Sequence, residues 1–270
     1  CEQGRNFCSK IWNAFRLIKG WTVDDNIQAP DAAKLAVHWF ESKQNEVAAE
    51  VADLFSKYRL SEALMAVYKL FWDEFSSWYL EMIKPAYGQG IDRTTYDATL
   101  CFLDNLLHLL HPFMPFITEE LWQQMYERNA EEGESLMVSA LSMDTYVDTA
   151  FVAQFEVVKG VISNIRSIRL QKNIAQKEPL DLQVLGENPV AEFNAVIQKM
   201  CNLSSITVVE SKVEGASSFM VGTTEYAVPL GNMIDVEAEI ARMEAELKHK
   251  EGFLQGVLKK LSNEKFVNNA

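Results

Sequence analysis

The sequence predicts a mainly α-helical fold, with a helix bundle, then a small α+β unit, then a C-terminal helix with coiled-coil spacing. Glycine and proline are scarce, at 12 and 7 of 270 residues, which disfavours a turn-rich all-β fold. Apolar residues make up 48% of the chain, enough for a sizeable core. In the first half they recur mostly every three or four residues, which is helical spacing. We place the three parts at 1–145, 146–231 and 232–270.

Five helices are expected in the first part. Gly20 is a natural residue to follow the first helix, and Pro85 stops the third. Pro112 and Pro115 form a double-proline turn that cannot be helix interior. The expected helices span 1–20, 31–54 with a break, 62–84, 94–110 and 118–126, with Ser61 and Thr118 as N-caps of the third and fifth.

The middle part has a different residue pattern, because short runs of β-prone residues replace most of the helical spacing. These runs alternate or are β-branched, as strands are. We expect helices at 151–170 and 189–201, and strands at 181–185, 206–209, 219–221 and 225–229, the last two joined at Gly222.

The last part carries apolar residues whose steps alternate between three and four, the pattern of a coiled-coil seam. These residues are Val236, Ile240, Met243, Leu247, Leu254, Val257 and Leu261, with Lys250 at the one interrupted position. A single helix cannot bury such a seam alone. We therefore expect it to fray, to dock on the body, or to pair with a second copy of the chain.

Bulk composition limits the classes of function. The formal net charge is −13, which argues against a non-specific nucleic-acid binder unless the charges are unevenly distributed. No apolar run reaches membrane-spanning length, so we expect no membrane partner. The four cysteines, Cys1, Cys8, Cys101 and Cys201, show no Cys-x-x-Cys spacing, which indicates reduced thiols and a cytoplasmic protein.

The first helix is a candidate surface for reading nucleic-acid bases. Its basic residues are opposed only by Glu2, its amides can bond to base edges, and a tryptophan nearby can stack. The candidates here are Arg5, Asn6, Lys10, Asn13, Arg16, Lys19 and Trp21, with Lys34 beyond them. A solvated helix face is the alternative interpretation, and the pattern alone leaves it open.

The run from Lys159 to Lys177 is a second candidate, because it holds five basic residues and no acidic one. Arg166 and Arg169 lie one helical turn apart and can form a joint phosphate clamp, with Lys172 close by. The alternative is a basic helix that pairs with acids elsewhere in the chain.

No candidate catalytic or metal site emerges from the sequence. His108 and His111 lie near Cys101, but no further ligand is in view, so we interpret them as structural. The aromatic residues between Phe71 and Tyr79 have the spacing of a core stripe. Gly-rich phosphate loops and His-Glu-x-x-His motifs are absent, so we expect no catalytic residue, metal or cofactor in this chain.

Three stretches resemble a known family. Gly4-Arg5-Asn6-Phe7-Cys8-Ser9-Lys10-Ile11-Trp12-Asn13-Ala14 resembles the opening of the anticodon-binding helical domain of valyl-tRNA synthetases. The stretch from Leu110 to Trp122 is similar to the Pro-aromatic turn of the class I enzymes for aliphatic amino acids. Leu261-Ser262-Asn263-Glu264-Lys265-Phe266-Val267, with Ile234-Asp235-Val236-Glu237 before it, resembles the coiled-coil arm of the valyl enzymes.

The resemblance implies a longer parent, expected to be monomeric, that uses ATP with Mg to activate valine, charges tRNA(Val) and edits errors. The family's nucleotide motifs are absent here, so this chain would bind tRNA without catalysing the activation or transfer of valine. The helical domain would grip the anticodon, and the arm would reach the tRNA elbow. Anticodon roles carry over only onto Arg5, Asn6, Lys10 and Asn13, which lie within the matching stretch. Arg16, Lys19, Trp21 and Lys34 are candidates from chemistry alone, as are Arg166, Arg169 and Lys172 for the tRNA backbone.

Two alternatives remain. One is the corresponding region of an isoleucyl-tRNA synthetase, whose family tail usually carries zinc-binding cysteine clusters that do not appear here. The other is a non-enzymatic helical interaction module with a coiled-coil tail. In the family the arm is an antiparallel hairpin, so its returning helix is expected just after Ala270, and the half present could self-associate through its seam.

Overall fold

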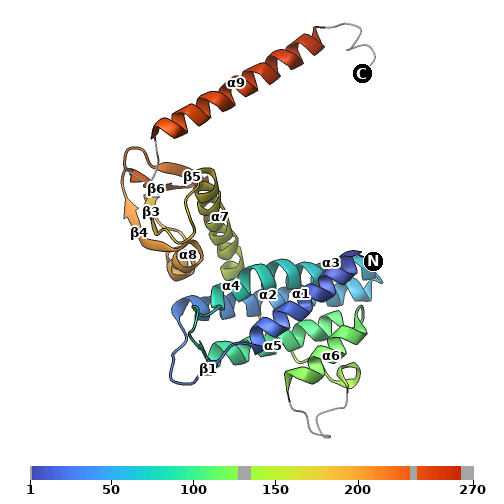
Figure 1. Cartoon of the computed structure of the whole chain (residues 1–270). Coiled ribbons are helices and arrows are strands. Elements are labelled where there is room, and N and C mark those ends of the chain that lie inside the picture. The colour runs from blue at the N-terminus through green and yellow to red at the C-terminus, as the bar shows by residue number, and fades with distance from the viewer. Residues whose placement is uncertain (1, 127–134, 232–235, 263–270) are drawn as a thin grey trace.

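The computed structural model describes residues 2–126, 135–231 and 236–262. It confirms the predicted mainly α class, with a helix bundle, a small α+β unit and a long final helix (Figure 1). The expectations about Cys1, Ile234-Asp235 and the arm tip beyond Ser262 lie outside the described residues.

The bundle is formed by helices whose connections are short. They are α1 (Glu2–Lys19), α2 (Asp31–Ser56), α3 (Leu60–Lys69), the π-helix η1 (Leu70–Tyr79), α4 (Leu80–Ile83), α5 (Arg93–Leu110) and α6 (Pro115–Met125). Two short parallel strands, β1 (Val23–Asp24) and β2 (Ile91–Asp92), pair the loops before α2 and α5. The core is aromatic, since the ring of Phe40 lies 5.3 Å from Phe75, 5.0 Å from Tyr79 and 5.2 Å from Phe102.

The predicted break in the second helix is wrong, because α2 is continuous from Asp31 to Ser56. In its polar segment 41–46, Ser42, Gln44 and Asn45 are buried. Gln44 donates to the carbonyl of Phe102 at 2.9 Å and accepts from Asn105 at 3.1 Å, both inside the bundle. Buried polar side chains with satisfied hydrogen bonds therefore hold the helix together there.

Both predicted N-caps are also wrong. α3 begins at Leu60, with Arg59 in the cap position and no capping side chain, so Ser61 is already helical. α6 begins at Pro115, and Thr118 lies in its first turn, where its hydroxyl donates to the carbonyl of Met114 at 2.9 Å. Proline supplies the pre-organised first turn of α6.

The third predicted helix is one rod made of α3, η1 and α4, and its middle ten residues are π-helical. Buried Phe71, Phe75 and Tyr79 recur there every four residues, and adjacent rings lie 5.5 Å apart. The same spacing is compatible with an α-helix. The sequence therefore predicted the buried stripe and not the winding.

The small unit consists of one mixed sheet with two main helices. Its elements are α7 (Thr149–Gln171), β3 (Leu180–Leu185), η3 (Ala191–Phe193), α8 (Asn194–Cys201), β4 (Leu203–Val209), β5 (Ser217–Val221) and β6 (Thr224–Val228). The strand order is β4-β3-β6-β5, in which β3 and β4 are parallel and the other pairs antiparallel. α7 packs closely on the sheet at Gly160, where an added Cβ would lie 3.0 Å from a methyl carbon of Val221.

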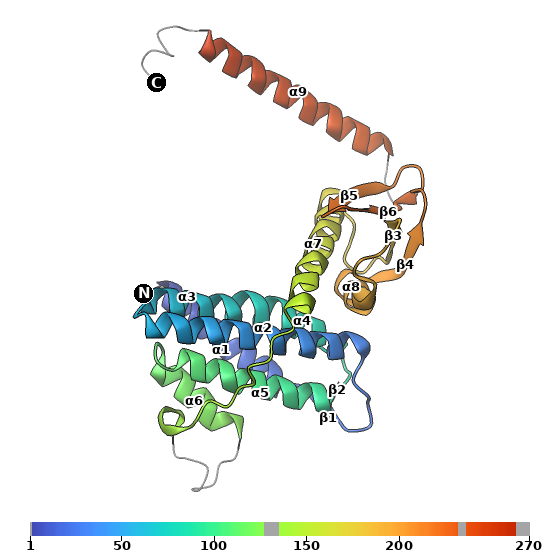
Figure 2. The same ribbon diagram turned by 180° about the vertical axis from the view of Figure 1, so that it is seen from behind.

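A connector that includes the turn η2 (Leu136–Val138) crosses the bundle before entering α7 (Figure 2). Asn45 of α2 donates to the carbonyl of Tyr146 at 2.9 Å, which anchors this connector. Asp148 then caps α7 by accepting from the backbone N–H of Phe151 at 3.0 Å. The start of α7 is therefore fixed against the bundle.

The final helix, α9 (Val236–Leu261), extends away from the small unit in both views (Figures 1 and 2). Leu247, Leu254 and Leu258 are 59%, 57% and 55% exposed. These leucines are apolar surface that the described residues do not cover. Pairing of the seam with a second helix stays a prediction.

Candidate nucleic-acid interface

The candidate surface on α1 is set by the way this helix packs. Phe7, Ile11, Ala14, Phe15 and Ile18 are buried and fix one face against the bundle. Arg5, Asn13 and Arg16 are exposed on the opposite side. Arg5 and Arg16 are eleven residues apart, three full helical turns, so they lie almost in line along the helix. The structure thus brings these three predicted residues onto one outer face.

Trp12 belongs to this exposed face, although it directly follows the fully buried Ile11. Its side chain is 36% exposed, and its ring lies 6.4 Å from that of Phe15. The stripe at 7, 11, 14, 15 and 18 is complete without position 12, and that spacing was the signal that could have identified Trp12. An exposed indole beside guanidinium groups is suited to stacking on a nucleobase.

Three other α1 candidates are turned away from this face or already bonded. The Lys10 ammonium lies 5.1 Å from the ring centroid of Trp72, in a cation–π contact. Asn6 lines a groove of about 480 Å³ beside Phe7, Tyr68 and Trp72. Lys19 donates to the carbonyl of Met125 at 3.1 Å and so ties the end of α1 to α6.

The remaining two base-reading candidates lie beyond α1. Trp21 is half-buried and packs against the bundle core. Lys34 is exposed in the first turn of α2 and lies 3.1 Å from the carboxylate of Asp31. Neither belongs to the outer face that holds Arg5, Asn13 and Arg16.

The expected phosphate clamp of Arg166 and Arg169 does not form, because Arg169 is buried. Its side chain is 1% exposed, and its guanidinium donates to the carbonyls of Ala175 at 2.9 Å and Cys201 at 2.7 Å. Arg169 continues the buried stripe of Ile162 and Ile165, four residues beyond the latter. Its assignment to the tRNA backbone is therefore wrong, and it joins the end of α7 to the end of α8.

The other cations of the basic run have different surroundings. Arg166 is exposed, and its guanidinium carbon lies 5.5 Å from the ring centroid of Trp78. Lys172 is half-buried at the C-terminus of α7. Lys159 is neutralised by Glu74 and Glu156, so for this residue the alternative of pairing with distant acids is correct.

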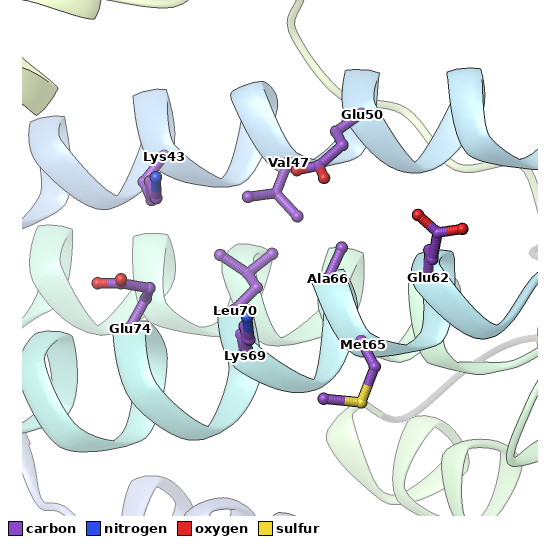
Figure 3. A pocket seen from close by; sticks show the side chains of 9 residues that line it. All are labelled: Lys43, Val47, Glu50, Glu62, Met65, Ala66, Lys69, Leu70 and Glu74. Atoms are coloured by element: carbon purple, nitrogen blue, oxygen red, sulfur yellow. The ribbon is translucent and has the colours of Figure 1, made fainter. Parts of the chain in front are cut away.

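A second hollow of about 400 Å³ lies between α2 and the rod of α3 and η1 (Figure 3). Its wall carries both signs of charge, because its lining residues include Lys43 and Lys69 together with Glu50, Glu62 and Glu74. Burial acts to lower the pKa of Lys43, but the hydrogen bond to Glu46 and the nearby carboxylates together raise it. A wall of mixed charge gives no preference for phosphate.

The described residues contain no cluster suited to a metal ion, and His108 and His111 have structural roles. No group of three potential ligands from His, Cys, Asp and Glu occurs among them. His108 bonds to the hydroxyl of Ser139 at 2.8 Å, and His111 to that of Thr118 at 2.8 Å. Burial raises the pKa of the Cys201 thiol to about 12, so it is not a nucleophile near neutral pH.

Within 2–126, 135–231 and 236–262, none of the helices has the length and apolar character needed to cross a bilayer.

The comparisons with known proteins agree in their matches, which are all tRNA ligases or their domains. The family model described as "Anticodon-binding domain of tRNA ligase" matches residues 37–184. A valine–tRNA ligase of Bacteroides thetaiotaomicron is 98% identical over the whole chain, which spans 31% of that protein. A valine–tRNA ligase of Phocaeicola vulgatus is 71% identical over the whole chain and 30% of its own length. One of Bacteroides fragilis is 69% identical over the whole chain and 31% of its own length. The chain therefore spans about a third of the curated relatives it matches.

Proposed function

The chain belongs to the family of anticodon-binding domains of tRNA ligases, and on that basis we propose that it is the tRNA-binding region of a valine–tRNA ligase. One valine–tRNA ligase is 98% identical to the chain over all 270 residues, and this observation supports valine as the amino acid. The longer protein activates valine with ATP and Mg, transfers it to tRNA(Val) as a monomer in the cytoplasm, and edits errors. This region binds tRNA and contributes no catalytic group.

In this proposal the outer face of α1 meets the anticodon loop. A guanidinium offers several fixed donors that can bond to base edges or phosphates, and an amide can pair with an adenine edge. Arg5, Asn13 and Arg16 supply these groups, and Trp12 between them supplies a surface for base stacking. An unpaired loop base exposes both its hydrogen-bonding edge and its ring surface. The outer face of α1 carries groups that can contact each of them.

The small unit and α9 contact the rest of the tRNA. Arg166 and Lys172 approach the phosphate backbone, and α9 with its partner helix reaches the elbow. The net charge of −13 is compatible with this role, because the four cations of α1 are opposed only by Glu2, and the run 159–177 holds five cations and no acidic residue. Phosphate binding depends on such local charge, and it weakens as salt increases. We assign the bundle to 1–145, the small unit to 146–231 and the arm to 232–270.

The test is binding of the full-length protein to transcripts of tRNA(Val) and of the same tRNA with its anticodon exchanged. Tighter binding to the cognate anticodon, weakening with salt, is expected. Equal affinity for both transcripts would overturn anticodon reading, and salt-independent or absent binding would favour a protein-interaction module.

The amino acid is tested separately by ATP–pyrophosphate exchange with valine or isoleucine. Exchange faster with isoleucine would favour the isoleucyl alternative.

A further inference from the structure

A lysine that is largely shielded from water joins the bundle to the small unit. The ammonium of Lys159, on α7, lies 2.6 Å from Glu74 Oε2 and 2.8 Å from Glu156 Oε1. Glu74 belongs to η1 of the bundle, 85 residues earlier in the chain. The side chains of Lys159 and Glu74 are only 12% and 18% exposed. This pair is therefore an inter-unit contact largely shielded from water.

Aromatic rings from both units surround the same ammonium. Its nitrogen lies 5.2 Å from the ring centroid of Trp39 on α2, and 5.8 Å from those of Trp78 on η1 and Phe155 on α7. Cation–π attraction within about 6 Å is stronger when water is excluded. One cation thus binds α7 to two separate elements of the bundle.

The contact extends along α7 in both directions. Towards its start, the rings of Trp39 and Phe155 stack at 4.2 Å, and that of His38 lies 4.5 Å from Phe151. Two turns beyond Lys159, the Arg166 guanidinium lies over Trp78. Apolar contacts are non-directional and permit sliding. The ion pair between Lys159 and Glu74 is more restrictive, because a displacement of α7 would separate two opposite charges that are largely shielded from water.

We propose that Lys159 is a positioning residue that fixes the angle between the bundle and α7, and so sets where the small unit lies relative to the α1 face. This inference rests on the proposed function, in which one tRNA contacts both units at once. A rigid joint makes the second contact intramolecular and raises the overall affinity without adding any contact. Lys159 acts through the joint and does not itself touch RNA.

The test uses full-length protein and two RNAs, the complete tRNA and its isolated anticodon stem-loop. Lys159→Met removes the charge and keeps much of the stem. We expect it to weaken binding of complete tRNA by about tenfold or more and to leave stem-loop binding unchanged, since only the complete tRNA reaches both units. Lys159→Arg, which retains a cation able to stack on the rings, should restore the affinity. Lys57→Met, an exposed change at the end of α2 and outside both candidate surfaces, is the control for net charge.

Unpairing Glu74 could itself disturb folding, so the double variant Lys159→Met with Glu74→Gln is measured alongside. It should fold and still lose affinity for complete tRNA only. Hydrogen exchange should become faster in η1 and α7 of the Met variants, whether or not RNA is present. Unchanged exchange, or equal effects on the two RNAs, would overturn the positioning role. If the wild type binds neither RNA, the proposed function fails, and the exchange measurement still decides the role of Lys159 in the joint.

Discussion

Arg169 Nη2 donates to the carbonyl oxygen of Cys201 at 2.7 Å, across 32 residues of sequence. The same nitrogen lies 3.3 Å from the carbonyl of Asn202, and Nη1 donates to Ala175. Three backbone carbonyls, where α7 and α8 end, therefore depend on one buried guanidinium. A residue that resembled a phosphate ligand in the sequence is a structural joint of the small unit.

Arg169→Ala should destabilise the small unit. We expect a loss of roughly 2–5 kcal/mol in the free energy of unfolding, because buried carbonyls lose their donors. Urea denaturation followed by circular dichroism measures it, with Arg166→Ala as the matched control from the exposed side of the same helix. A variant as stable as the wild type would contradict the structural role.

Arg166→Ala and Lys172→Ala should change RNA affinity instead. If each contacts a phosphate, the slope of log affinity against log salt should flatten by about one unit per substitution, equally for all tRNAs. Fluorescence anisotropy over a salt series gives this slope. A slope unchanged in the double variant would exclude both residues from backbone contact.

Arg5→Ala and Arg16→Ala should each weaken cognate tRNA binding by roughly 1–3 kcal/mol if the residue reads a base. They should also reduce the preference for the cognate anticodon. Titration of cognate and anticodon-exchanged transcripts separates the two effects. Lys34→Ala, on α2 and paired with Asp31, is the comparison. A uniform loss for both transcripts would mean that the arginines contact phosphates only.

Glu119 should give the bundle a pH-dependent component of stability. Burial acts to raise its pKa, but hydrogen bonds from Gln123, Ser135 and the backbone of Leu136 outweigh burial and lower it below 4.5. A lowered folded-state pKa means that the stabilisation is complete above the unfolded-state pKa. It disappears as pH falls through the lower, folded-state value.

The difference in unfolding free energy between wild type and Glu119→Gln should therefore be constant above about pH 5.5 and shrink in more acidic solution. Chemical denaturation across this range measures it. Glu120→Gln, an exposed neighbour, is the control. A difference that grows on acidification would show that the ionised carboxylate is not the stabilising form.

The exposed stripe of α9 should drive self-association of the 270-residue chain. Leu247 and Leu254 are more than half exposed and seven residues apart, so they lie on one face. Sedimentation over a concentration series should reveal a dimer that disappears in Leu247→Glu with Leu254→Glu. His249→Glu, on the opposite face, should leave the dimer intact. Dissociation by the His249 change, or a monomer at every concentration, would contradict pairing through this stripe.

The sequence by itself determined the helical class, the order of the main elements and the buried aromatic stripe between Phe71 and Tyr79. These features are encoded by local periodicity, because a repeat of three or four fixes which side of a helix faces the core. It also directed attention to Arg5, Asn13 and Arg16, which share the outer face of α1. Their roles in reading the anticodon stay predictions.

The tertiary structure decided which charged groups have partners. Arg166 and Arg169 are one turn apart in the same helix, yet one is exposed and the other is 1% exposed beneath α8. Lys159 meets Glu74, 85 residues away. Such contacts cannot be predicted from the local sequence, because they depend on how separate helices pack. Helix packing therefore determines which cations are exposed and could contact RNA.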